Sequence, residues 1–165
     1  MKKLVVLILF ALGFLSCGDQ KVEEEGKEDN SIALVDLKKL PKKVNPSEGA
    51  TLILRDWTEY NAINSAMNAI YNAETKEDLT VVVEDLIEKQ KLLESSVYPE
   101  VFNRADIKSR QKVFKTYILK IKSNMEYDIN PRAAVIEMVK AYNAYNNQFS
   151  VVINSTLDPE LLFDE

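Results

Sequence analysis

The stretch "NPRAAVIEMVKAYNAYNNQFSVVIN", Asn130 to Asn154, decides the fold class of this chain. Its apolar residues alternate steps of four and three positions, which is the spacing of a helix face that packs against other helices. Pro131 suits the first position of a helix, so we expect a helix from there to about Asn154. The expected packing face comprises Val135, Val139, Tyr142, Asn146, Phe149 and Ile153.

Three more helices are predicted upstream of this one. Asn45 and Pro46 favour one helix start, Thr75 with Asp78 forms a capping box at another, and Pro99 marks a turn before the third. The expected bounds are about 45–73, from 75 to before 99, 104–125 and 131–154. Four helices of similar length with short connections favour an antiparallel bundle. We therefore predict an all-α fold, an antiparallel up-down four-helix bundle, over residues 45–165.

The first 17 residues carry a different pattern. Lys2 and Lys3 precede the apolar run "LVVLILFAL", which has the layout of a secretory signal peptide and is too short to cross a membrane as a helix. The motif "FLSC" that follows, ending at Cys17, resembles the lipobox of bacterial lipoproteins. In that family a peptidase cuts before the cysteine, which then carries acyl chains. Two or three such chains hold a protein on a membrane stably.

This resemblance implies a small helical lipoprotein of the cell envelope, on the periplasmic or surface face of the outer membrane. We expect a cleaved signal peptide at residues 1–16 and lipidation, with palmitate among the acyl groups, at Cys17. Residues 17–44 are expected to form an acidic, disordered tether, because they hold much charge and little to bury. From Ser31 onward, this tether is expected to contain a short docking helix or an extended segment.

Residue types exclude several kinds of chemistry. The chain has no histidine, which removes a Ser-His-Asp triad and the histidine ligands of zinc and di-metal bundles. No glycine-rich phosphate loop is present, and an acylated Cys17 is not a nucleophile. We therefore expect a non-enzymatic binding or structural module without a metal or cofactor. The alternative is a small-ligand binder or enzyme with a polar pocket at the bundle centre, lined by Asp56, Asn64 and Tyr142.

A basic stripe is predicted on the helix at 104–125. Its cations fall on one arc, opposite the apolar face of the same helix. They are Arg104, Lys108, Lys112, Lys115 and Lys122. The formal charge of the chain is −5, so nucleic acid is not an expected partner, and the stripe is a local reversal of sign. The stripe is either a solvated face balanced by the protein's own acids, or a contact for an anionic envelope component or protein.

A buried polar layer is the second predicted feature of the helices. Counting along an up-down bundle places three amide side chains near the same height and a fourth, that of Gln90, about a turn lower, each on the apolar arc of its helix. They are Asn64, Gln90, Gln111 and Asn146. Because a lone buried amide costs about 1 to 3 kcal/mol for each unsatisfied group, we expect these side chains to satisfy one another in the interior.

Overall fold

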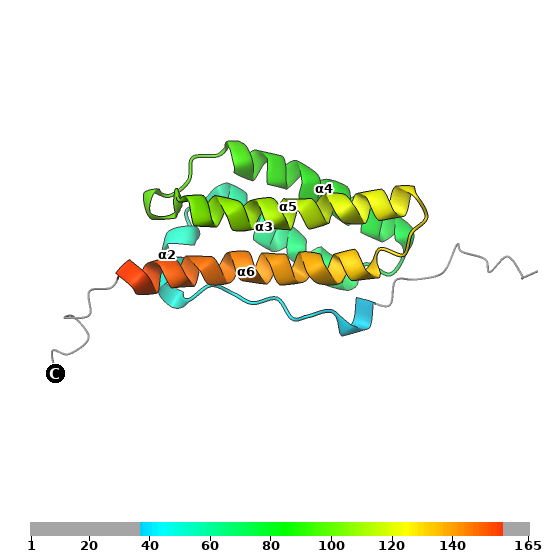
Figure 1. Ribbon diagram of the computed structural model, residues 1–165, viewed down its shortest axis with the longest axis horizontal. Coiled ribbons are helices and arrows are strands. Elements are labelled where there is room, and N and C mark those ends of the chain that lie inside the picture. Colours follow the sequence, from blue (N-terminus) through cyan, green and yellow to red (C-terminus); the bar gives the residue numbers. More distant parts are fainter. Residues whose placement is uncertain (1–36, 157–165) are drawn as a thin grey trace, which may run out of the picture. The chain divides into compact units, whose positions relative to one another are not determined.

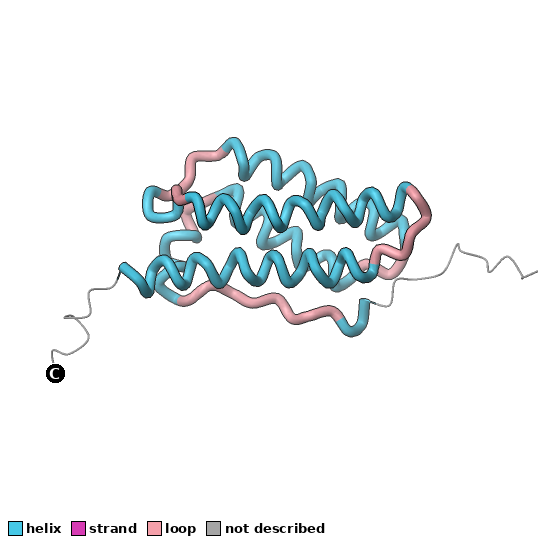
Figure 2. The backbone as a smooth tube through the Cα atoms, viewed as in Figure 1, coloured by secondary structure: helices cyan, strands magenta, loops and turns pink. Residues whose placement is uncertain are grey.

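A computed structural model describes residues 37–156 of the chain, and this part consists of helices and connecting loops without a strand (Figures 1 and 2). The all-α prediction is therefore confirmed for the described part. The elements are η2 (Leu37–Lys39), α2 (Glu48–Leu54), α3 (Thr58–Ala69), η3 (Ile70–Asn72), α4 (Lys76–Ser95), η4 (Glu100–Phe102), α5 (Ala105–Glu126) and α6 (Arg132–Thr156).

The prediction of one helix over 45–73 is wrong, because the chain breaks into α2 and α3 at Arg55–Trp57. Trp57 adopts φ −95° and ψ 93°, which lies outside the helical region. This conformation places its indole in the core, 3% exposed, where Nε1 donates to Ser96 Oγ at 2.9 Å. Asn61 Nδ2 donates to the carbonyls of Leu54 and Arg55 and so satisfies the free end of α2. Burial and hydrogen bonding of the tryptophan thus outweigh helix continuity.

The three later helices begin and end close to their predicted positions. The capping box of α4 is present: Asp78 N donates to Thr75 Oγ1 at 3.0 Å, and Asp78 Oδ2 accepts from Thr75 N at 3.0 Å. Hydrogen bonding by the Thr75 side chain, with bonds from the backbone N–H groups of Glu74 and Thr75, holds the pKa of the Asp78 carboxyl below its usual value. Local capping signals therefore set the start of this helix.

The helices pack side by side (Figure 1): α4 contacts both α3 and α5, and α6 contacts α5. The short helix α2 packs on α6, where a Cβ at Gly49 would come within 3.1 Å of Ile153, so glycine permits the close approach. An aromatic cluster fills one end of the core. Its rings are Trp57, Tyr60, Phe102, Tyr145 and Phe149. Burying each such side chain contributes about 1.5 to 3 kcal/mol.

Candidate functional site

A loop segment, residues 40–47, stretches along α6 before α2 begins (Figure 2). We call it the strap. Side chains on one face of α6 bind its backbone: Asn143 Oδ1 accepts from Val44 N at 2.9 Å, and Asn143 Nδ2 donates to Lys42 O at 2.9 Å. Ser47 N donates to Ser150 Oγ at 2.8 Å. The described part of the tether region thus contains one 3-10 turn, η2, followed by a docked, non-helical segment.

The other side of the strap is held by α3 and the turn after it. Lys43 Nζ donates to the backbone O and the Oδ1 of Asn64, both at 3.1 Å, and to Asn68 Oδ1 at 2.6 Å. Tyr71 OH donates to Pro41 O at 2.7 Å. Partial burial lowers the pKa of Lys43 from its usual value. The strap is therefore bonded from both α3 and α6.

Two of the predicted amides lie beneath the strap. Asn64 Oδ1 accepts from Tyr142 OH at 2.9 Å, and Asn146 Oδ1 accepts from Tyr60 OH at 3.1 Å. Asn146 Nδ2 donates to Val44 O at 2.7 Å. Burial raises the pKa of Tyr142 to about 12 and raises that of Tyr60 as well, so both phenols stay protonated donors at neutral pH. The amide oxygens of Asn64 and Asn146 are thus bonded by tyrosines, and both asparagines also bond the strap.

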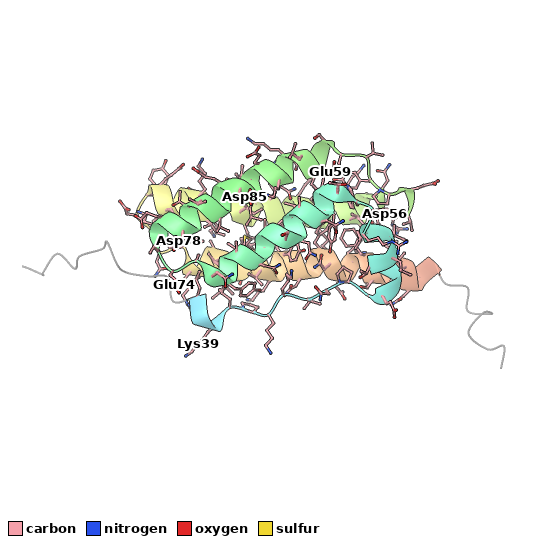
Figure 3. The ribbon with its side chains drawn as sticks, turned by 180° about the vertical axis from the view of Figure 1, so that it is seen from behind. Lys39, Asp56, Glu59, Glu74, Asp78 and Asp85 are labelled. Atoms are coloured by element: carbon pink, nitrogen blue, oxygen red, sulfur yellow. The ribbon has the colours of Figure 1, made fainter. Side chains whose placement is uncertain are left out.

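The predicted lining of a central pocket is not brought together. Asn64 and Tyr142 bond to each other, as described above. Asp56 lies at the break between α2 and α3, where its side chain is 80% exposed and faces Arg55 Nε at 3.7 Å (Figure 3). The structure gives Asp56 no contact with the other two, so these residues do not form one site.

The other two predicted amides belong to α4 and α5. Gln90 and Gln111 are 1% and 2% exposed. Tyr98 OH donates to Gln111 Oε1 in a short hydrogen bond. Within residues 37–156, Gln111 Nε2, both polar atoms of Gln90 and the Tyr145 hydroxyl have no hydrogen-bond partner. Each such buried group costs about 1 to 3 kcal/mol.

The four amides therefore do not form one hydrogen-bonded layer. Gln90, Gln111 and Asn146 are buried and Asn64 is half-buried, but no hydrogen bond joins any two of them in the described part of the chain. Asn64 and Asn146 are hydrogen-bonded under the strap, whereas Gln90 and Gln111 keep buried groups without a partner among the described residues. The reason is that the strap and two tyrosines bond the asparagines, whereas Tyr98 bonds only the oxygen of Gln111.

A pocket of about 510 Å³ opens beside Gln111. It lies between the end of α4, the loop that follows it and the first turns of α5. We call it the α4–α5 pocket, and its lining residues are Glu94, Ser96, Val97, Tyr98, Asn103, Lys108, Gln111 and Lys112. The periodicity of α5 singled out three of these residues. The loop residues carry no sequence signal, because their place depends on the packing of Trp57 against Tyr98, with ring centroids 4.8 Å apart.

The basic stripe is partly neutralised by the protein's own acids. Arg104 pairs with Asp106 at 3.2 Å, Lys115 with Glu94 at 2.6 Å, and Lys122 with Glu126 at 3.9 Å. The hydrogen bonds between Arg104 and Asp106 raise the pKa of the guanidinium and lower that of the carboxyl. These exposed pairs contribute little to stability, but they remove much of the charge that the sequence places on this face.

Two cations of the stripe stand apart from these pairs. Lys108 Nζ lies over the ring of Tyr98, 5.1 Å from its centroid. The ammonium of Lys112 has neither an ion pair nor a hydrogen bond among the described residues. Both residues line the α4–α5 pocket. The two lysines of the stripe that form no ion pair among the described residues therefore both lie at the pocket.

Comparisons with protein-family models, curated proteins and solved structures give no match to this chain. Residues 37–156 contain no cluster of three or more carboxylate, histidine or cysteine side chains suited to a metal ion. None of the helices in that range is long and apolar enough to cross a membrane. Cys17, the predicted lipidation site, and the residues up to 36 lie outside the described part.

Proposed function

We propose that this protein is a lipid-anchored, non-enzymatic binding or structural module of the cell envelope, attached to the outer membrane through acyl chains on Cys17. The lipobox-like motif and the signal-peptide layout before it support the anchor. The strap is the observation that supports a binding or structural module. The polar residues that α3 and α6 present near the core bind the chain's own segment, which leads from the tether, instead of framing a reaction centre.

We propose further that α2 and α3 act as one bent helix, so that α2 to α6 form an antiparallel up-down four-helix bundle. The packing order supports this arrangement: α3 lies against α4, α4 against α5, and α5 against α6. Contacts of Tyr60 with Tyr145 and Phe149, with ring centroids 6.5 and 5.5 Å apart, join α3 to α6 and support closure of the bundle. The strap then covers the seam between the first and last helices.

The proposed partners are the membrane, through Cys17, and an anionic component or protein of the envelope, through the basic stripe of α5. Lys108 and Lys112 are the cations of the stripe that internal pairs leave available. An anionic partner would meet these two first, and the contact would weaken as salt screens it.

The anchor is tested by replacing the cysteine. We expect Cys17→Ser to abolish incorporation of labelled palmitate and to leave an uncleaved precursor, while the chain with Asn45→Ser serves as a control for a substitution outside the motif. Normal processing and membrane retention of the Cys17→Ser protein would refute the lipoprotein proposal. Fractionation of inner and outer membranes then tests the proposed location.

A further inference from the structure

The α4–α5 pocket contains a hydrogen-bond donor that the protein leaves unused. Gln111 lines the pocket and is 2% exposed. Its Oε1 accepts from Tyr98 OH, which fixes the amide orientation, and its Nε2 has no partner in residues 37–156. Burial raises the pKa of Tyr98, so this phenol remains a donor at neutral pH. The amide therefore offers N–H groups to an acceptor.

The charges around this donor favour an anion. Lys108 and Lys112 line the pocket together with one carboxylate, that of Glu94. Glu94 is engaged by Lys115 at 2.6 Å, and the other two cations make no ion pair among the described residues. The lining residues thus carry two positive charges and one negative charge. Because Lys115 already pairs with Glu94, the positive charges of Lys108 and Lys112 are left to attract an anion.

We infer that the α4–α5 pocket binds a small organic monocarboxylate. Its carboxylate accepts hydrogen bonds from Gln111 Nε2 and from the ammonium groups of Lys108 and Lys112, and its body lies against the Tyr98 ring and Val97. The pocket volume of about 510 Å³ is within the common range for small-molecule sites. Inorganic phosphate is disfavoured, because it has no apolar body to lie against the Tyr98 ring and Val97.

This inference goes beyond the proposed function and does not depend on Cys17, because every group it uses belongs to α4, α5 and the loop between them. It also differs from the predicted polar pocket at Asp56, Asn64 and Tyr142, whose residues the structure does not gather. Loss of acyl labelling would therefore leave the pocket proposal standing, and loss of ligand binding would leave the anchor proposal standing.

Trp57 provides the readout, since it is the single tryptophan of the chain and contacts the pocket wall. Its indole donates to Ser96 Oγ and packs on Tyr98, both of which line the pocket. We would titrate the full chain, in a non-ionic detergent, with butyrate, with the neutral butyramide and with inorganic phosphate. We expect a saturable change in tryptophan emission with butyrate, with a Kd of about 1 mM for so small a ligand.

Butyramide and phosphate are expected to bind at least about tenfold more weakly. Equal binding of butyrate and butyramide would overturn the inference, because the cations would then contribute nothing. Tighter binding of phosphate than of butyrate would also overturn it, as would no saturable change with any of the three.

Substitutions locate the site. We expect Lys112→Gln to weaken butyrate binding about tenfold and Gln111→Glu to abolish it, since the new carboxylate repels the ligand. Lys120→Gln removes a cation from the same helix outside the pocket lining and is the matched control. If Gln111→Glu fails to fold, the comparison of Lys112→Gln with Lys120→Gln decides whether butyrate binds at the pocket. Equal affinity in these two variants would refute the assignment of the pocket.

Discussion

The two polar regions of the core differ in what their amides bind. Under the strap, Asn64 and Asn146 are hydrogen-bonded to tyrosines and to residues 43 and 44. In the second region, on α4 and α5, Gln90 has no hydrogen-bond partner in the described part of the chain, and Gln111 has a partner for its oxygen but not for its nitrogen. Amide side chains thus stabilise the region under the strap, whereas the unpaired amide groups of Gln90 and Gln111 lower the stability of the fold.

This difference shows which buried groups could still form a hydrogen bond to a ligand. Removing a group from a satisfied pair leaves its partner unpaired, which costs far more than the net value of the hydrogen bond. Removing an unsatisfied amide has no such penalty. Variants in the two regions should therefore change stability in opposite directions, and the unsatisfied region is the one with hydrogen-bonding groups left for a ligand.

The largest expected effect comes from alkaline pH, because Tyr60, Tyr142 and Tyr145 are all buried. Burial raises the pKa of each phenol above the ordinary value of 10.0, to about 12 for Tyr142. The unfolded chain therefore loses these protons at lower pH than the folded chain. Stability is present in full below pH 10 and falls as pH rises toward 12, by about 4 kcal/mol at pH 11 for the three together.

Circular dichroism and tyrosinate absorbance along a pH titration check this expectation. We expect buried tyrosines to ionise together with unfolding; ionisation of all the tyrosines near pH 10 in a chain that stays folded would contradict it. Phe substitutions separate a hydroxyl that has a hydrogen-bond partner from one that has none. At neutral pH, Tyr60→Phe should destabilise by about 1 to 3 kcal/mol, because it leaves Asn146 short of a donor, whereas Tyr145→Phe should be neutral or stabilising.

Asn146→Ala should lower the free energy of unfolding by about 2 to 4 kcal/mol, because it leaves the buried Tyr60 hydroxyl without its acceptor and opens a small cavity. Asn143→Ala is the matched control. It removes two bonds to the same strap, but Asn143 is half-buried and water can replace these solvent-exposed bonds, so a loss of about 1 kcal/mol or less is expected. Urea unfolding measures both. Equal losses would show that burial does not separate the two sites.

Gln90→Met should raise the free energy of unfolding by about 1 to 2 kcal/mol. The substitution keeps the length of the side chain and removes two buried polar atoms that have no partner. Gln148→Met is the control, because the amide of Gln148 donates to Asp106 Oδ2 at 3.2 Å and its loss should destabilise slightly. Destabilisation by Gln90→Met would contradict the contrast between the two polar regions.

Lys43→Met should have the smallest effect, about 1 kcal/mol, since the ammonium is only partly buried and its bonds are partly replaced by water. The expected result is local: the amide protons of Val44 and Ser47, which bond to α6, should exchange about fivefold faster. Lys42→Met, whose side chain is exposed, should leave both rates unchanged. Unchanged exchange in Lys43→Met would show that α6 alone holds the strap.

Local signals in the sequence predicted the helices best. The capping box at Thr75 and the Asn-Pro pair at 130–131 place the starts of α4 and α6 to within one or two residues. The break before α3 has no such signal, because the apolar spacing continues through Ile53, Trp57 and Tyr60. What breaks the helix is a hydrogen bond to Ser96, 39 positions away, which depends on tertiary packing.

The candidate site could also be predicted only in part, because it too depends on tertiary packing. Periodicity placed Lys108, Lys112 and Gln111 on α5, but their neighbours in the pocket come from the end of α4 and its loop. Whether a lysine is paired depends on that packing too, as with Lys115 and Glu94, which lie 21 positions apart. Helix periodicity gives the direction of a side chain, and the partner it meets is decided by the neighbouring helix.

The direction of the strap has a mechanical consequence. Residue numbers rise in the same sense along the strap and α6, since Lys42 and Val44 bond to Asn143 and Ser47 bonds to Ser150. A force along the axis of α6, applied through the chain before Leu37, therefore loads these bonds in shear, all at once. Separation would require them to rupture together rather than one by one. In a chain held at Cys17, the strap would serve as a latch that resists extraction of the domain's first helix under tension.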